Sequence, residues 1–310
     1  MTQQNSSRHV VYFFDAGFES CSLISLHSVL ARTPGPLKIT LHPTFDSATL
    51  ETDAEKLRAR FPHAEITVHP IDINQFSHIP SGPLPLTARV RLLLPRLHSG
   101  RLLYIDGDTL ARKDISPLLD MDLGGACVSG SVVARVALNL ALARGTGKKA
   151  KKAREKLRAQ AGALDGIDMQ RYFNSGIMIF DLDRIAELGL DARMMDLDET
   201  RKYANRDQTF LNALFNDHVA MFDPAWNSGW GEPRTANSYV PKELRDYFRT
   251  AREDPGILHY KGREKPWDAE TTPFRLHLLM QGRKRRSRAR YWDEFQTERR
   301  ATEAVLGRSL

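Results

Sequence analysis

The stretch that most constrains the fold is residues 101–109, Arg-Leu-Leu-Tyr-Ile-Asp-Gly-Asp-Thr. Its apolar, β-favouring run ends abruptly in two carboxylates, Asp106 and Asp108, which are separated by one glycine. This pattern is typical of a buried strand that delivers acidic side chains to the edge of a sheet. Because residues i and i+2 of a strand share a side, we expect both carboxylates to face one cation, while Gly107 lets its backbone come close.

The paired carboxylates indicate a divalent metal ion. Their hard oxygen atoms suit Mg²⁺ or Mn²⁺, and such an ion is most useful where it neutralises a diphosphate. The net charge of +7 is consistent with such a substrate, since it favours anionic partners such as nucleotides, acidic glycans, nucleic acid or lipid head groups. We therefore interpret this edge of the predicted sheet as the active site.

Before this stretch, short apolar runs alternate with helix-spaced apolar residues. Strands are predicted at residues 9–14, 37–42 and 66–71, and helices at residues 21–30 and 49–60. The alternation predicts an α/β fold with a mostly parallel, doubly wound sheet. With 310 residues, 41% of them hydrophobic, the chain is long enough for one large domain with a tail and too apolar for general disorder.

The N-terminal residues, the lengths of the apolar stretches and the two cysteines indicate the cellular compartment. Residues 1–9 are polar and lack the long apolar core of a secretion signal. No stretch approaches the roughly 20 apolar residues that cross a bilayer. Cys21 and Cys127 each lie among apolar neighbours without metal-ligand spacing. A reduced, cytoplasmic protein is the expectation.

Three polar residues near the predicted sheet, one aspartate and two arginines, each allow two interpretations. Asp15 follows the first strand, where it either caps the next helix or hydrogen-bonds a nucleoside, since open α/β sheets bind ligands beyond the carboxyl ends of their strands. Arg89 and Arg91 interrupt the apolar residues of a helix predicted at residues 87–98. Each arginine forms either an exposed ion pair or a contact to phosphate or carboxylate.

Further polar residues stand at the beginnings of later elements. Asn174 opens a strand predicted at residues 172–180, where it either closes a turn or offers an amide to a sugar hydroxyl. Asp207 suits the N-terminal turn of a helix. Gln208 adds an uncharged donor and acceptor that a polyhydroxyl ligand can use.

Residues 258–267 form the second informative stretch. A histidine alone would more often be structural, but here His259 stands close to Gly262 and Lys265. Together these residues supply a metal ligand, a backbone N–H that can approach closely, and a point charge for phosphate.

Two segments are strongly basic. Residues 131–170 are rich in Ala, Lys, Arg and Leu, which predicts a basic helical insertion whose charge is either simply solvated or faces an acidic acceptor or a membrane. Residues 271–310 read as a tail, in which residues 283–292 join a basic cluster to Tyr291 and Trp292. That combination suits anionic lipid head groups, at about 1 kcal/mol per basic residue, with RNA binding or plain solvation as alternatives.

The order of these motifs resembles glycosyltransferase family 8, retaining enzymes with a GT-A fold that include bacterial lipopolysaccharide galactosyl- and glucosyltransferases and glycogenin. The resemblance covers residues 9–267. It rests on Leu-Tyr-Ile-Asp-Gly-Asp at 103–108, the arginine helix at 88–95, Tyr-Phe-Asn-Ser-Gly at 172–176, Asp-Gln at 207–208, and His-Tyr-Lys-Gly-Arg-Glu-Lys-Pro-Trp at 259–267. The last match is the most specific.

The resemblance implies a GT-A catalytic domain at residues 1–270 and a retaining hexosyltransferase that uses UDP-glucose or UDP-galactose. Its acceptor would be a glycan or glycolipid of lipopolysaccharide or another surface polysaccharide, built at the inner face of the cytoplasmic membrane, where residues 283–292 would dock the enzyme. Gly17 and Ser129 depart from the bacterial branch, so the donor sugar stays open. The implied roles are metal binding by Asp106, Asp108 and His259, phosphate binding by Gly262 and Lys265, uridine binding by Asp15, and sugar binding by Arg91, Asn174, Asp207 and Gln208, the last two forming the catalytic pair.

Two other classes are weighed against this one. A sugar nucleotidyltransferase also uses aspartates and a metal, but it is expected to carry a glycine-rich loop after its first strand, which residues 15–18 do not supply. A basic nucleic-acid-binding protein with a degenerate fold would interleave aromatics with its charges, and these basic segments do not. No nucleic-acid partner is therefore expected.

Overall fold

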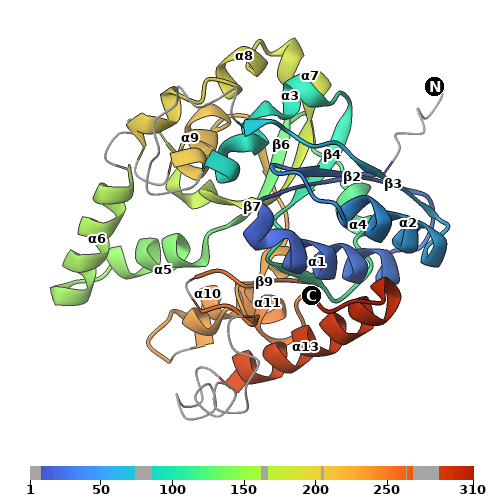
Figure 1. Ribbon diagram of the computed structural model, residues 1–310. Helices are drawn as coiled ribbons and strands as arrows, with labels where there is room; N and C mark the ends of the chain where they lie inside the picture. The colour runs from blue at the N-terminus through green and yellow to red at the C-terminus, as the bar shows by residue number, and fades with distance from the viewer. Residues whose placement is uncertain are drawn as a thin grey trace.

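The computed structural model describes residues 8–73, 86–161, 167–203, 206–236, 238–262, 264–267 and 286–310. A seven-stranded sheet runs through its centre (Figure 1). Its strands, in spatial order, are β3 (Ala64–Val68), β2 (Leu37–Pro43), β1 (His9–Phe14), β4 (Arg101–Ile105), β7 (Phe173–Asp181), β6 (Val128–Val132) and β8 (Val219–Met221). Strands β5 (Thr109–Ala111) and β9 (Ile257–His259) form a second, two-stranded sheet.

The large sheet is mostly parallel, as predicted. Strands β1 to β4 pair in parallel, as do β6 and β8, whereas β7 runs antiparallel to both of its neighbours. The strand order reverses between β1 and β4, because the chain first builds outward through β2 and β3 and then returns. Open α/β sheets bind ligands in the crevice at such a switch point, beyond the carboxyl ends of the strands.

Helices cover both faces of the sheet (Figure 1). One apolar cluster joins the sheet to α1 (Glu19–Arg32) and α2 (Leu50–Arg60), and another joins it to α7 (Leu182–Glu187) and α9 (Arg206–Leu214). All six residues of β1 are buried, and the five from Val10 to Phe14 alternate between the two clusters. Burial on both faces explains why this strand is continuously apolar.

The other helices of the described residues are α3 (Leu94–Leu97), α4 (Ser116–Leu119), α5 (Ala134–Ala143), α6 (Gly147–Ala161), α8 (Asp191–Met194), α10 (Lys242–Tyr247), α11 (Arg249–Glu253) and α13 (Arg286–Leu306). Short 3₁₀ helices lie at Ala16–Phe18, Leu86–Leu93, Met169–Arg171, Glu199–Lys202, Pro224–Asn227 and Pro233–Ala236.

The predicted helix at residues 87–98 is wrong in type. The chain there forms a 3₁₀ helix at Leu86–Leu93, and only the short helix α3 follows it. Pro95 explains part of the difference, because proline lacks the N–H that a continuous α-helix would donate to the carbonyl of Arg91. The strand predicted at residues 66–71 is also displaced, since β3 begins at Ala64 and ends at Val68.

Helices α5 and α6 form an arm that projects beside the sheet (Figure 1). Ala150 and Ala153 of α6 are buried, whereas the lysines at 148, 149, 151 and 152 are exposed. Small residues thus face the protein and the charges face solvent. The arm begins after residue 132, because residues 131 and 132 belong to β6.

The C-terminal helix α13 packs against the rest of the protein. Tyr291 and Trp292 are only 1% and 8% exposed, in an apolar cluster with Trp230, Tyr260 and Phe295. The Tyr260 hydroxyl donates to the carbonyl oxygen of Tyr291 at 2.9 Å. The interpretation of these two aromatics as membrane-facing is therefore wrong, because protein core covers them. Residues 283–285 lie outside the described residues.

A helix that crosses a bilayer needs about 20 predominantly apolar residues. Within the described ranges, no helix is both long and apolar enough to cross a membrane.

A buried histidine cluster beside β1 and β2 predicts acid-sensitive stability. His42 Nε2 lies 2.8 Å from His98 Nε2, and the His9 and His98 rings are 5.0 Å apart. Burial lowers the pKa of His9 and His42 to about 4 and that of His98 to about 3. Folding therefore favours neutral imidazoles, so the free energy of unfolding is highest above the unfolded pKa of about 6.5 and falls as pH drops toward 4.

Urea unfolding at pH 7.5, 6 and 5 measures this loss, which we expect to reach several kcal/mol because each unit of pKa difference contributes about 1.4 kcal/mol. His98→Gln keeps a hydrogen-bonding group without a titrating one, and it should flatten the decline. His218→Gln, outside the cluster, should not. Equal acid sensitivity in both variants would contradict the prediction.

Candidate active site

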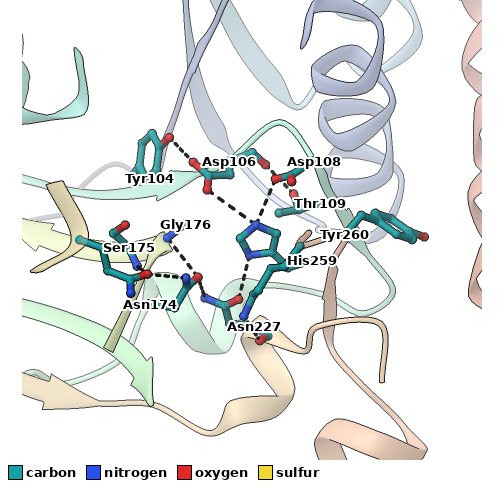
Figure 2. Close-up of polar contacts among 12 residues, drawn as sticks. Tyr104, Asp106, Asp108, Thr109, Asn174, Ser175, Gly176, Asn227, His259 and Tyr260 are labelled. Atoms are coloured by element: carbon teal, nitrogen blue, oxygen red, sulfur yellow. Dashed lines mark hydrogen bonds and ion pairs between the residues drawn. The ribbon is translucent and has the colours of Figure 1, made fainter. Parts of the chain in front are cut away.

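Asp106 and Asp108 lie just beyond β4, in the bend that leads to β5 (Figure 2). Both turn toward His259 at the end of β9. His259 Nε2 is 3.1 Å from Asp108 Oδ1 and 3.7 Å from Asp106 Oδ2. Among the described residues, these three form the group of acidic and histidine side chains with ligand atoms within 4.8 Å of one another. The predicted convergence of the two acids and the histidine is thus confirmed.

The backbone feature that brings the two acids together differs from the predicted one. Strand β4 ends at Ile105, so the acids meet through the bend rather than through strand alternation. Gly107 also serves a different purpose from the one predicted. A Cβ atom there would lie 2.0 Å from the Ser22 hydroxyl oxygen, so glycine is required by the close packing of the bend against α1.

Each acid has one oxygen held by other side chains and one directed at His259. Asp106 Oδ1 accepts from the Tyr104 hydroxyl and lies 3.2 Å from the guanidinium of Arg91. Asp108 Oδ2 is 2.5 Å from Lys265 Nζ. Burial alone would raise the pKa of Asp108, but the charges and hydrogen bonds of His259 and Lys265 outweigh burial and lower that pKa well below its ordinary value.

An amide relay connects Gln208 to this cluster. A backbone N–H can only donate, so the donors of Ser175 and Gly176 fix the amide orientations. The Gly176 N–H donates to Asn174 Oδ1 at 3.2 Å, and the Ser175 N–H donates to Gln208 Oε1 at 3.4 Å. Asn174 Nδ2 therefore donates to Gln208 Oε1, at 2.7 Å.

The relay continues to His259 through Asn227 (Figure 2). Asn227 Nδ2 donates to Asn174 Oδ1 at 2.9 Å, which leaves Asn227 Oδ1 as the acceptor 3.0 Å from His259 Nδ1. Nδ1 therefore carries a proton, and Nε2 faces the carboxylates. A bare lone pair 3.1 Å from a carboxylate oxygen would be repelled, so a proton or a metal ion must lie between them. Two carboxylate oxygens and an imidazole nitrogen fit Mn²⁺ or Mg²⁺.

Asn227 was missed in the sequence, where it is one asparagine in a loop without a motif. It orients the imidazole, and such partners of metal ligands typically change metal affinity by about 10- to 100-fold. We expect Asn227→Leu to weaken Mn²⁺ binding by that factor in calorimetry, and Asn227→Asp, which keeps the acceptor for Nδ1–H, to lose much less. Equal affinities in the wild type and the leucine variant would show that the relay has no such role.

Arg91 connects Asp106 to Asp207. Its guanidinium donates to the Ser175 carbonyl at 2.6 Å, and its Nε lies 3.4 Å from Asp207 Oδ2. The same group stacks over the Tyr104 ring at 4.6 Å. Asp207 is buried in the first turn of α9, and burial raises its pKa. The sequence assigned these arginine and aspartate residues to one site, and the structure brings them together.

The remaining predicted residues lie around Lys265. Asp15 follows β1 and caps a 3₁₀ turn, its Oδ1 accepting from the Phe18 N–H at 3.1 Å. Lys265 Nζ lies 5.8 Å from the centre of the Phe18 ring and 5.3 Å from that of Trp267. Gly262 is exposed, with a φ of +106° that favours glycine. Asp15 thus caps the 3₁₀ turn rather than the predicted helix, since Phe18 stands at the N-cap of α1, and Phe18 itself has no motif in the sequence.

Comparison with known proteins decides the family. The model described as glycosyl transferase family 8 matches residues 9–271. The chain belongs to this family. Family 8 membership makes it a glycosyltransferase, and it favours the transferase over the nucleotidyltransferase and nucleic-acid-binding alternatives.

Relatives and a solved structure agree with this assignment. General stress protein A of Bacillus subtilis (strain 168) is 27% identical over 223 residues, which cover 66% of this chain and 68% of that protein. Lipopolysaccharide 1,2-glucosyltransferase of Escherichia coli (strain K12) is 29% identical over 171 residues, 54% of this chain but only 44% of that enzyme. The structure of the galactosyltransferase LgtC with donor and acceptor sugar analogues has a TM-score of 0.64 at 20% identity, covering 93% of this chain and 95% of LgtC. This likeness shows the GT-A fold.

Proposed function

We propose that this family 8 enzyme moves a hexose, glucose or galactose, from a UDP-sugar to a glycan or glycolipid acceptor, with retention and with the help of Mn²⁺ or Mg²⁺. The observation that supports this most is the convergence of Asp106 Oδ2, Asp108 Oδ1 and His259 Nε2 beside Lys265. The relative from Escherichia coli, lipopolysaccharide 1,2-glucosyltransferase, supports a lipopolysaccharide or other surface glycan as the product.

The cations of the site would stabilise the leaving group. Asp106, Asp108 and His259 would hold the metal ion, which supplies positive charge to the diphosphate when bound. Cleavage of the anomeric C–O bond leaves growing negative charge on UDP. Lys265, held by Asp108 and by the Tyr260 carbonyl at 2.8 Å, is placed to stabilise that charge, and the exposed backbone of Gly262 adds a further phosphate contact.

The relay favours front-face attack over a covalent intermediate. Both hydrogen-bond donors to Gln208 Oε1 occupy its lone pairs, which makes a weakly nucleophilic amide still weaker. In front-face attack, the acceptor hydroxyl forms its bond to the anomeric carbon as the bond to UDP breaks, and its proton passes to the departing phosphate. Asp207, held by Arg91, would orient the sugar and stabilise its positive charge.

The sugar and the nucleotide would occupy opposite sides of the cluster. Asn174, Gln208 and the Arg91–Asp207 pair would contact the hexose. Asp15 and Phe18 would contact the uridine end, where Phe18 is 36% exposed and offers a ring on which a base can stack, worth about 1–3 kcal/mol.

Peripheral binding to an anionic membrane through residues 283–292 would depend on basic side chains alone. The aromatic residues of this segment are buried, and Arg288 and Arg290 pair with Glu264 and Glu294 at 2.6 and 3.0 Å.

The deciding experiment measures UDP release from a panel of UDP-sugars, with Mn²⁺ or with EDTA. Metal-dependent hydrolysis of one donor would support the proposal and identify the sugar. Calorimetry of UDP with Mn²⁺ accompanies the assay, because binding without turnover would mean that the reaction requires its acceptor. No release from any donor, together with no binding of UDP and Mn²⁺, would overturn the proposal.

A further inference from the structure

A cavity of about 580 Å³ lies between the arm and the chain that follows Asn227. Among the described residues, its charged lining side chains are all basic. The basic side chains are Arg135 of α5, Lys156 of α6, Arg234, Lys261 and Arg288. The metal cluster, Asp106, Asp108 and His259, does not line the cavity, and neither does Lys265, the lysine proposed to bind phosphate.

Part of this charge has acidic neighbours, since Glu232 Oε1 and the Lys261 side chain both lie beside Gly229, whereas the charges of Arg135 and Lys156 on the arm have none at ion-pair distance among the described residues. Arg288 pairs with Glu264 at 2.6 Å, and Lys261 Nζ donates to the Asn227 carbonyl at 3.2 Å. The uncompensated positive charge of the cavity is therefore that of Arg135 and Lys156. Several like charges around one cavity repel one another unless an anion occupies it, so the lining favours a ligand with negative charge.

The cavity also offers aromatic surface for a ring. Tyr239 is 49% exposed, and Lys149 Nζ lies 5.0 Å from the centre of its ring. Trp230 lines the cavity, and its buried indole N–H has no hydrogen-bond partner among the described residues. An anion beside an apolar ring face matches an acidic sugar, whose C–H groups pack on aromatic rings while its charge pairs with arginine or lysine.

The backbone at this wall is held in an unusual conformation. Trp230 and Glu232 have φ angles of +52° and +47°, and Gly231 between them has +77°. Non-glycine residues in this region cost about 1–3 kcal/mol each, and such outliers cluster at ligand-binding sites. Packing supports the segment, because Trp230 stacks edge-on against Tyr260 at 4.8 Å.

The cavity borders the reaction centre through two short connections. Lys261 stands two residues after His259, and Gly229 stands two residues after Asn227, so both connections begin at the relay. The donor diphosphate already has the metal cluster and Lys265. We propose that this cavity binds a phosphate or carboxylate group carried by a sugar of the acceptor, which makes the acceptor an acidic saccharide. This inference rests on the proposed transferase function.

The test measures binding of glucose 6-phosphate, glucuronic acid and neutral glucose to the full chain saturated with UDP and Mn²⁺. Saturation keeps the probes out of the donor site. We expect both acidic sugars to bind about tenfold or more tightly than glucose, with an affinity that falls as salt rises. The double variant Arg135→Gln/Lys156→Gln should lose this preference and retain UDP binding. Both residues are exposed on the arm, so the fold should tolerate the change.

The matched control is Lys151→Gln/Lys152→Gln, which removes the same charge from exposed positions of α6 outside the cavity lining. It should keep the preference for acidic sugars. Equal binding of glucose and the acidic sugars would overturn the inference, as would an equal loss in both double variants. Displacement of glucose 6-phosphate by a single-stranded oligonucleotide, dependent on Arg135 and Lys156, would assign the cavity to nucleic acid instead.

The outcome is separable from that of the proposed function. Hydrolysis of a UDP-sugar by water does not need the cavity, so normal hydrolysis without a preference for acidic sugars would remove this inference alone. Absence of both UDP binding and hydrolysis would remove the transferase proposal. In that case, binding of the acidic sugars is measured without UDP and reports only whether the cavity takes anions.

Discussion

Asp108→Asn is expected to lower metal-dependent release of UDP by about 10³-fold. The substitution keeps the shape of the side chain but removes the charge that faces His259 Nε2 at 3.1 Å. It also removes the carboxylate that holds Lys265 Nζ at 2.5 Å, so one change disturbs both positive charges proposed to stabilise the leaving diphosphate. A neutral amide is a weaker ligand for a hard divalent cation than a carboxylate.

Two measurements test this expectation. The first is the initial rate of UDP release from the donor that the wild type prefers. The second is the stabilisation that Mn²⁺ and UDP give to the folded protein, which amounts to about 2.7 kcal/mol when a ligand is at 100 times its Kd. The wild type should show this gain in thermal unfolding, and Asp108→Asn should not.

Asp53→Asn provides the matched control. Asp53, on α2, is also buried and is paired with a basic residue, since Arg308 lies 2.7 Å from its carboxylate. We expect this variant to release UDP normally even where its Tm falls. If Asp108→Asn kept Mn²⁺-dependent release within about tenfold of the wild type, Asp108 would not be a metal ligand.

The parts of the fold and site that the sequence predicted are those set by local pattern. Alternating strands and helices sufficed for the mostly parallel sheet, because strand-length apolar runs such as β1, which is buried on both faces, alternate with helix-spaced apolar residues. Asp15 and Asp106 were each predicted to follow a strand, and because β1 and β4 pair in parallel, both lie beyond the same edge of the sheet. The direction of β7 depends on how the long segment after β6 returns to the sheet, which no local pattern shows.

Residues whose roles depend on several distant elements could not be predicted. Asn227 acquires its role only when three segments bring Gln208, Asn174 and His259 within hydrogen-bonding distance. The cavity needs α5, α6 and residues 229–239 together, and its charge was visible only as a basic composition.

For α13, the sequence held a signal that composition obscured. Tyr291, Phe295, Glu298 and Thr302 are buried and recur at helical spacing, which marks one face of a helix packed on protein. The basic residues before them suggested lipid instead. Glu298 accepts from Arg32 at 2.6 Å and lies 2.7 Å from His27 Nδ1, so even the charged member of this face is used internally.

Gly176→Ala is expected to remove most activity, although the substitution adds or removes no charge. Gly176 lies in β7, and its carbonyl accepts from the Asp106 N–H at 2.7 Å. A Cβ atom there would lie 2.3 Å from His259 Cε1 and 2.4 Å from Asp106 Oδ2. A methyl group must therefore push two of the proposed metal ligands aside. A displacement of about 1 Å in such a site can cost about 10²-fold in rate, and we expect at least that loss together with weaker Mn²⁺ binding.

Overpacking also destabilises proteins, typically by about 1–3 kcal/mol, so the comparison needs a variant that overpacks elsewhere in the same sheet. Gly130→Ala in β6 meets this need, because its Cβ would lie 2.9 Å from the Cβ atom of Phe173 and is directed at the core rather than at the metal ligands. Both variants should unfold at lower urea concentrations than the wild type. Only Gly176→Ala should lose Mn²⁺ affinity in calorimetry, because only its methyl group displaces the proposed ligands. Equal retention of Mn²⁺ binding and UDP release in the two variants would mean that Asp106 and His259 do not hold the ion in the arrangement described.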